Sequence, residues 1–190
     1  MATIIRPAPF SRFDKAALAA CALALVGWIV APAHAAVGVL MLIAGVVLAA
    51  RLARWAGDRT LADRLVLVLH VAYAFVPLGF LLLGAAVFTN LPPTAGIHAW
   101  TAGAIGLMTL AVMTRATLGH TGRPLRASPT TEIIYALVLL SALLRIAAAL
   151  AGSPALVDYA GLAWIGGFML FVVTFGPLLI ARRPDWAEAR

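Results

Sequence analysis

The sequence has a single cysteine and few charged side chains. Charged residues make up 11% of the 190 positions, and Asp and Glu together number only 7. One cysteine, Cys21, excludes an internal disulfide and a cysteine-based metal site. Because Cys21 lies in an apolar run, we interpret it as a small buried hydrophobic residue.

The residue sets of common hydrolases and kinases are also missing. We find no Ser/His/Asp set, no phosphate-binding glycine loop and no carboxylate pair inside an apolar run. The acids Glu132 and Asp158 fall at predicted helix ends, and the lack of a mid-membrane carboxylate weakens the case for a proton-coupled transporter. No catalytic residue is predicted, and enzyme activity is left open.

Hydrophobic residues, in contrast, dominate the chain. They make up 64% of it, and the mean hydropathy is +1.03. A soluble domain of this size cannot cover so much apolar surface, whereas a lipid bilayer can. The net charge of +7 does not indicate nucleic-acid binding, because the basic residues lie in short segments between apolar runs long enough to span a membrane.

The apolar runs predict an all-α fold, a polytopic integral membrane bundle of six transmembrane helices. A bilayer core of about 30 Å needs about 20 apolar helical residues. We expect a single transmembrane domain over residues 1–190, with spans near 15–30, 34–52, 64–88, 97–117, 132–151 and 156–181. Polar or proline-rich connections separate the spans, and Pro77 and Pro177 are expected to kink the helices that contain them.

The basic residues predict how the bundle is oriented. They occur at the N-terminus, in the second and fourth connections and at the C-terminus: Arg6, Arg12, Lys15, Arg51, Arg54, Arg59, Arg64, Arg115, Arg123, Arg126, Arg182, Arg183 and Arg190. The positive-inside rule therefore places both termini in the cytoplasm. An alternative reading takes the first run and Ala33-His34-Ala35 as a signal peptide with its cleavage site; we keep the run as a span.

This orientation divides the histidines between two levels. His34 and His98 open the second and fourth helices near the outer side, whereas His70 lies about 9 Å in from the inner side and His120 beyond the inner end of the fourth helix.

On a helical wheel, one face of the fourth helix is small or weakly polar. It carries His98, Thr101, Ala102, Ile105, Thr109, Val112 and Met113. Such residues either permit close helix packing or leave room for a flat ligand.

Residues 97–125 also carry a family resemblance. The chain resembles the NnrS family of bacterial inner-membrane proteins, which are linked to haem, copper and the nitric oxide response. The shared residues are His98, Gly103, Gly106, Met108, Thr109, Met113, Arg115 and the loop 119–124 (Gly-His-Thr-Gly-Arg-Pro), with Leu69, His70, Tyr73 and Arg145. The resemblance covers roughly 64–184; family members are typically about twice as long, and nothing here matches their N-terminal half.

The resemblance implies b-type haem, with copper as a second possible metal. A CxxCH motif is absent, which excludes covalent c-type attachment. Imidazole ligates haem iron and copper, and thioethers suit Cu(I). The candidate metal ligands are His70, His98, His120, Met108 and Met113; Tyr73, Arg123 and Arg145 are candidates for contacts with the cofactor.

Each candidate also has a structural reading. The histidines could be hydrogen-bonded or solvated, the methionines could fill the core, and Tyr73 could either orient His70 or simply pack. Arg123, with Arg115 and Arg126, could contact haem propionates or only set orientation. Arg145, at membrane depth, needs an anion, either Asp158 or a propionate.

Two functions follow. The first is a haem-containing membrane protein that binds nitric oxide or relieves nitrosative stress. The alternative is a cofactor-free six-helix subunit or small transporter. We also expect a homo-oligomer or a membrane partner, because small-residue helix faces favour association.

Overall fold

The computed structural model describes residues 8–180, and within that range it is helical with no strand. Five long helices are α1 (Arg12–Val30), α2 (Ala35–Ala53), α3 (Arg64–Ala86), α6 (Pro129–Ala151) and α7 (Pro154–Ile180). The fourth crossing is one continuous helix of three parts, α4 (Pro93–His98), the π-helical η2 (Ala99–Gly106) and α5 (Leu107–His120). These six crossings are long and apolar enough to span a membrane, which confirms the predicted fold class.

Local signals in the sequence explain where the helices begin and end. Proline is the first residue of α4, α6 and α7, a position where its missing N–H costs nothing. Asp63 caps α3 by accepting hydrogen bonds from the amides of Leu65 and Val66, and α6 ends at Gly152 in the left-handed conformation.

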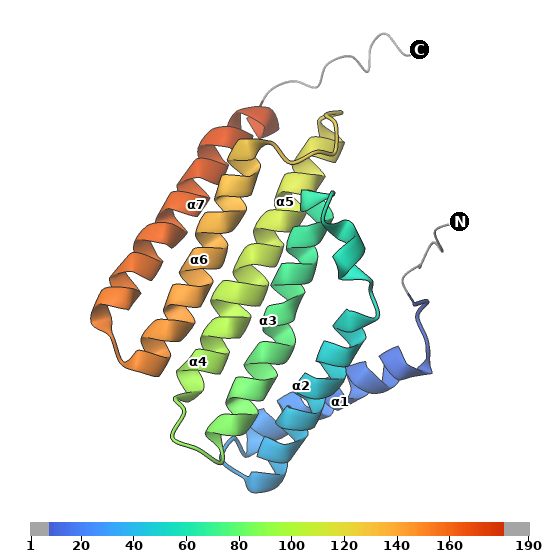
Figure 1. Cartoon of the computed structure of the whole chain (residues 1–190), viewed down its shortest axis with the longest axis vertical. Coiled ribbons are helices and arrows are strands. Elements are labelled where there is room, and N and C mark those ends of the chain that lie inside the picture. Colours follow the sequence, from blue (N-terminus) through green and yellow to red (C-terminus); the bar gives the residue numbers. More distant parts are fainter. Residues whose placement is uncertain (1–7, 181–190) are drawn as a thin grey trace.

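The crossings pack side by side, with the fourth between α3 and α6 (Figure 1). Outside this layer α7 packs on α6 and α2 on α3, while α1 crosses α2 at a steep angle at the edge of the bundle. One core cluster joins α3, α5, α6 and α7, and a second joins α1, α2 and α3. The fourth crossing is therefore the element that most of the bundle surrounds.

The up-and-down topology sorts the connections into two ends. The loops before α2, α4 and α7 lie at one end, and the α5–α6 loop lies at the other (Figure 1). The connections at the first end carry no Lys or Arg, whereas the α2–α3 and α5–α6 connections do, as the charge pattern predicted. The predicted basic residues Arg6, Arg182, Arg183 and Arg190 lie outside residues 8–180.

The fourth crossing is longer than predicted, which corrects the position of two histidines. It begins at Pro93, so His98 is its sixth residue and not its first. It ends at His120, so that side chain belongs to the last helical turn and not to the loop beyond. Proline at the first position and the weakly polar Thr117–His120 turn extend the helix past the apolar run from which its length was predicted.

Pro77 lies inside α3, as predicted, and a neighbouring helix supports the backbone there. The indole N–H of Trp100 donates a hydrogen bond of 3.0 Å to the carbonyl of Val76, directly before the proline. This bond ties the fourth crossing to α3 at the proline.

Candidate functional site

A groove of about 670 Å³ lies between the fourth crossing and α7, with α6 at its base. Its volume is within the range of about 300 to 1,000 Å³ that is usual for small-molecule sites. Its lining residues are His98, Thr101, Ala102, Ile105, Gly106, Thr109, Ser141, Arg145, Val157, Ala160, Gly161, Trp164, Ile165 and Phe168. We call this cavity the α4–α7 groove.

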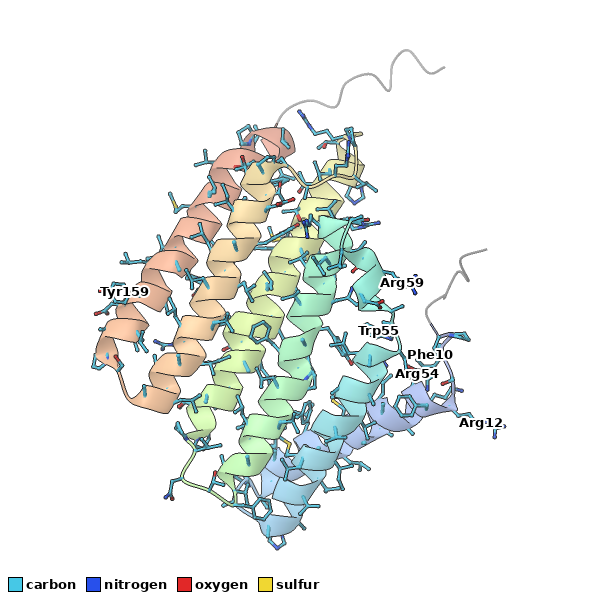
Figure 2. The ribbon with its side chains drawn as sticks, in the orientation of Figure 1. Phe10, Arg12, Arg54, Trp55, Arg59 and Tyr159 are labelled. Atoms are coloured by element: carbon cyan, nitrogen blue, oxygen red, sulfur yellow. The ribbon has the colours of Figure 1, made fainter. Side chains whose placement is uncertain are left out.

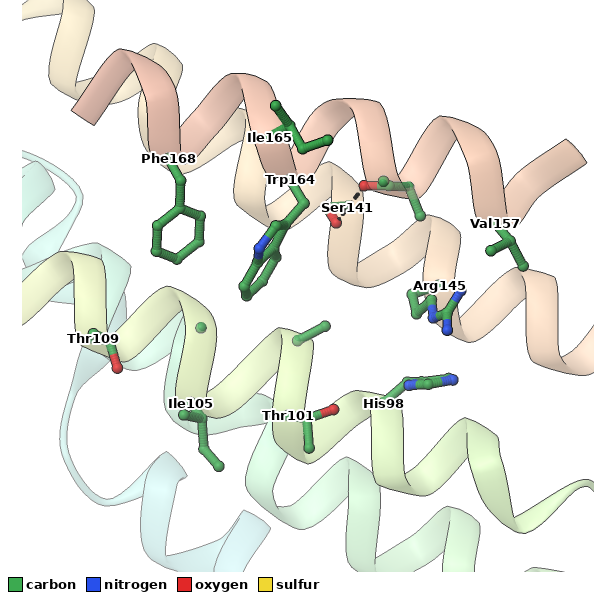
Figure 3. Close-up of a pocket in the computed structure, with 14 residues that line it drawn as sticks. His98, Thr101, Ile105, Thr109, Ser141, Arg145, Val157, Trp164, Ile165 and Phe168 are labelled. Atoms are coloured by element: carbon green, nitrogen blue, oxygen red, sulfur yellow. Dashed lines mark hydrogen bonds between the residues drawn. The ribbon is translucent and has the colours of Figure 1, made fainter. Parts of the chain in front are cut away.

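One end of the groove is polar. His98 on α4 and Arg145 on α6 point toward one another across the space between their helices (Figure 3). His98 is five residues from the start of the fourth crossing and Arg145 six from the end of α6, so both lie about 8–9 Å from the same end of the bundle. Arg145, a basic side chain inside a spanning helix, thus adjoins an imidazole.

Arg145 has no anionic partner within residues 8–180. The ion pairs of this part of the chain join Arg51 to Asp14, Arg59 to Asp58 and Arg64 to Glu132. The two partners predicted for Arg145 were Asp158 and a cofactor carboxylate, and the structure forms no ion pair with Asp158, which does not line the groove. The half-buried guanidinium instead faces the cavity, without an ion pair or hydrogen bond to any described residue.

The rest of the groove is apolar. Trp164 and Phe168 of α7 form a tilted aromatic pair with ring centroids 4.6 Å apart, facing the fourth crossing (Figure 3). A Cβ on Gly106 would lie 2.5 Å from the Trp164 ring, so glycine is what lets the indole approach the helix this closely. On the rim, Ile105 and Ile165 are 63% and 60% exposed. The groove therefore opens sideways, toward the lipid.

The predicted small and weakly polar face of the fourth crossing forms one wall of this groove. His98, Thr101, Ala102, Ile105 and Thr109 all line it, whereas Val112 and Met113 do not. Close helix packing, one of the two uses predicted for the small residues, is present in the structure. Gly103 packs closely on α3, where an added Cβ would lie 2.4 Å from the Phe75 ring, while Ala102 and Gly106 line the groove.

The groove wall is a π-helix over Ala99–Gly106. Such segments are rare and occur frequently at functional sites, because they change the direction in which side chains leave the helix. The segment begins directly after His98 and contains four of the lining residues.

His70 lies away from the groove. Its Nδ1 is 3.1 Å from the carbonyl oxygen of Val66, and its ring packs against Trp55 and the backbone of Gly57. Tyr73 does not orient His70 by a hydrogen bond. Its hydroxyl accepts one of 2.9 Å from Arg51, and its ring lies 4.6 Å from that of Trp55.

The remaining candidates are spread over the bundle. Met108 packs against a core cluster, Met113 is 40% exposed, and Arg123 lies exposed in the α5–α6 connection. His34 caps α2, with Nδ1 accepting a hydrogen bond from the amide of Ala36. Within residues 8–180, no three His, Cys, Asp or Glu side chains gather as a metal site would require. Neither His70 nor His120 therefore belongs to such a group.

Sequence reasoning missed the far side of the groove. Ser141, Gly161, Trp164 and Phe168 lie on α6 and α7, and Ser141 donates a buried hydrogen bond of 2.7 Å to the carbonyl of Ala160 that joins these helices. Gly161, Trp164 and Phe168 are spaced by three and four residues, so the sequence predicts that they share one face of a helix. It does not reveal which neighbouring helix that face contacts.

Comparison with known proteins identifies one family. The model described as NnrS protein matches residues 2–183, nearly the whole chain. The match includes the first two helices, which the sequence resemblance over roughly 64–184 did not cover. No curated protein and no solved structure matches the chain.

Proposed function

This chain belongs to the NnrS family, and from that premise we propose that it is a multi-pass membrane protein of the nitric oxide response that holds a b-type haem in the α4–α7 groove. The observation that carries the proposal is the polar end of the groove. There an imidazole and a guanidinium that has no anionic partner among residues 8–180 adjoin an apolar cavity of about 670 Å³.

The residues present fit a haem by their chemistry. His98 offers the nitrogen that most often ligates haem iron, and Arg145 offers a cation for a propionate. Trp164 and Phe168 supply aromatic surface for a flat apolar ring system, and within residues 8–180 no Asp or Glu lines the groove to repel propionates. A propionate would also remove the cost of an uncompensated charge at membrane depth.

When bound, the haem would supply an iron centre able to bind nitric oxide. The protein's own part is to hold the group and exclude water from it. The apolar rim of Ile105 and Ile165 faces lipid, and the aromatic side chains of Trp164 and Phe168 line the wall of the groove on α7. Nitric oxide is small and uncharged, so it can reach this groove through the bilayer.

The other predicted cofactor residues have weaker support. His70, His120, Met108 and Met113 remain predicted metal ligands, and Tyr73 and Arg123 predicted cofactor contacts, but none lines the groove. Copper therefore stays an implication of the resemblance. We further propose the bacterial inner membrane as the location and cytoplasmic termini, both from the charge pattern.

The test is the optical spectrum of the detergent-purified chain, expressed with ample haem, before and after dithionite and then with nitric oxide. We expect a Soret band, sharp reduced bands and a shift on addition of nitric oxide. His98→Ala should remove most of the pigment and Arg145→Ala lower it, because they remove the nitrogen ligand and the propionate partner.

The matched control is His34→Ala, which changes a histidine outside the groove and should keep the pigment, and His70→Ala tests the competing predicted ligand. A colourless wild-type protein would contradict the proposal and leave the cofactor-free subunit or transporter. Pigment lost in His70→Ala but kept in His98→Ala would move the haem to the other end of the bundle.

A further inference from the structure

The α4–α7 groove is also suited to a membrane lipid. Its rim residues Ile105 and Ile165 are largely exposed and apolar, so in a bilayer the cavity is open to acyl chains. An apolar groove of about 670 Å³ next to liquid hydrocarbon takes up hydrocarbon whenever no other ligand fills it.

The polar end selects the head of such a lipid. Arg145 and His98 face the cavity, no carboxylate lines it, and Arg145 has neither an ion pair nor a hydrogen bond to any residue of the described chain. Arg145 is six residues from the end of α6, which corresponds to about 9 Å along the helix axis. A long arginine side chain can extend over much of this distance and bring its guanidinium to the headgroup layer. The groove thus offers a positive end at the depth of lipid headgroups and an apolar trough below it.

We propose that the groove binds one acidic phospholipid of the leaflet nearer to Arg145, with its phosphate on the guanidinium and an acyl chain along Ile105, Trp164 and Ile165. Haem and lipid then compete, since both place an anionic group on Arg145 and apolar atoms in one cavity. Lipid binding itself does not depend on the proposed haem function, and only the competition rests on it.

Two substitutions separate the head from the chain. Arg145→Gln removes the charge but keeps a hydrogen-bonding side chain. Gly161→Leu fills the groove, and it does so without a clash at the point of attachment, because a Cβ on Gly161 meets no atom within 4 Å. The controls are Arg64→Gln, a half-exposed cation at the start of α3, and Gly176→Leu on the same helix as Gly161 but outside the groove.

The experiment is native mass spectrometry of the haem-free chain released from bilayers of equimolar phosphatidylglycerol and phosphatidylcholine with matched acyl chains. The wild type should retain one phosphatidylglycerol. Arg145→Gln should lower the preference over phosphatidylcholine about fivefold, as expected for one basic contact. Gly161→Leu should lose both lipids, and the two controls should behave as wild type.

If Gly161→Leu and Gly176→Leu retained the same amount of lipid, the groove would not be the lipid site. If Arg145→Gln and Arg64→Gln had the same preference for phosphatidylglycerol over phosphatidylcholine, Arg145 would not contact the headgroup. Retention of a free fatty acid in place of a phospholipid would overturn the assignment of the ligand. Added haem should release the lipid, and a chain carrying both would overturn the shared groove. If the protein bound lipid but never haem, the proposed haem function would be rejected and the lipid site would stand. The two outcomes are distinguishable because mass reports the lipid and visible absorbance reports the haem.

Discussion

At the scale of single residues, the structure gives Arg51 a function beyond orientation. Its Nε lies 3.1 Å from Oδ1 of Asp14, its Nη1 donates to Tyr73, and its guanidinium carbon lies 4.8 Å from the Trp55 ring centre. Asp14 also accepts hydrogen bonds from the amide and hydroxyl of Ser11. The cluster joins α1 to the end of α2 and to α3. The Trp55 ring of this cluster lies near Phe10 and Arg54 in Figure 2.

We therefore predict that Asp14→Asn loosens α1 from the bundle. The change leaves Arg51 without its counter-charge in a nearly buried position, and α1 has few other contacts beyond α2. The midpoint temperature of thermal unfolding in detergent should fall by several degrees, and limited proteolysis near residue 31 should become faster.

The matched control for this prediction is Asp58→Asn. Its pair with Arg59 is exposed, with side chains 74% and 56% accessible, so its loss should change little. Equal effects of the two substitutions would show that the Asp14 pair does not hold the helix.

At the scale of elements, the fourth crossing packs against α3 on one side and α7 on the other, with a glycine at each contact. Gly103 brings Phe75 of α3 close, and Gly106 brings Trp164 of α7 close. The π-helical stretch, which begins directly after His98, places Thr101 and Ile105 in the wall of the groove. The same helix is thus tightly packed on one side and open on the other.

Replacing Gly103 with alanine should destabilise the bundle by about 1–3 kcal/mol, the usual cost of overpacking. The added Cβ would lie 2.4 Å from Phe75, and the aromatic ring or the helix would have to move. Equilibrium unfolding of the purified protein in a mixed detergent system measures the change.

Gly161→Ala is the control, since it makes the same exchange in a helix where the new Cβ meets nothing within 4 Å. It should be neutral or slightly stabilising, because alanine is the better helix former. A Gly103→Ala protein as stable as Gly161→Ala would show that the α3 contact adapts freely.

At the scale of the whole molecule, charge and topology agree. Alternating connections carry or lack basic residues, and the bundle gathers the two kinds at opposite ends (Figure 1). The positive-inside rule then predicts the side of the membrane on which each end lies. Broad apolar surfaces on α1 and α7, with Tyr159 pointing outward in Figure 2, are then in contact with lipid.

This orientation predicts which loops face the outside of an intact cell. In a Cys21→Ala background, Ser153→Cys in the α6–α7 connection should react with a membrane-impermeant maleimide, whereas Thr121→Cys in the α5–α6 connection should react only after lysis. Thr89→Cys before α4 should match Ser153→Cys. The opposite pattern would invert the proposed orientation and place the polar end of the groove in the inner leaflet.

Much of the site's fourth-helix wall could be predicted from the sequence, because five side chains at helical spacing share one face whatever packs on it. The partners of those side chains could not. Arg145 had two predicted partners, and choosing between them required knowing that Asp158, only 13 positions away, makes no ion pair with it. Likewise the charge of Arg51 could be read as an orientation signal, but its pairing with Asp14 spans 37 positions.

By itself, the sequence determined the number of crossings, their approximate ends and the sorting of charge. These depend on local composition and helical periodicity, and the bilayer imposes them on any apolar run of that length. Only the tertiary structure decided that His98 and Arg145 share one groove, that α6 and α7 complete it, and that His70 packs elsewhere. Those facts depend on which helix faces pack together, and this is set by close contacts such as Gly103 with Phe75 and Gly106 with Trp164, between residues far apart in the chain.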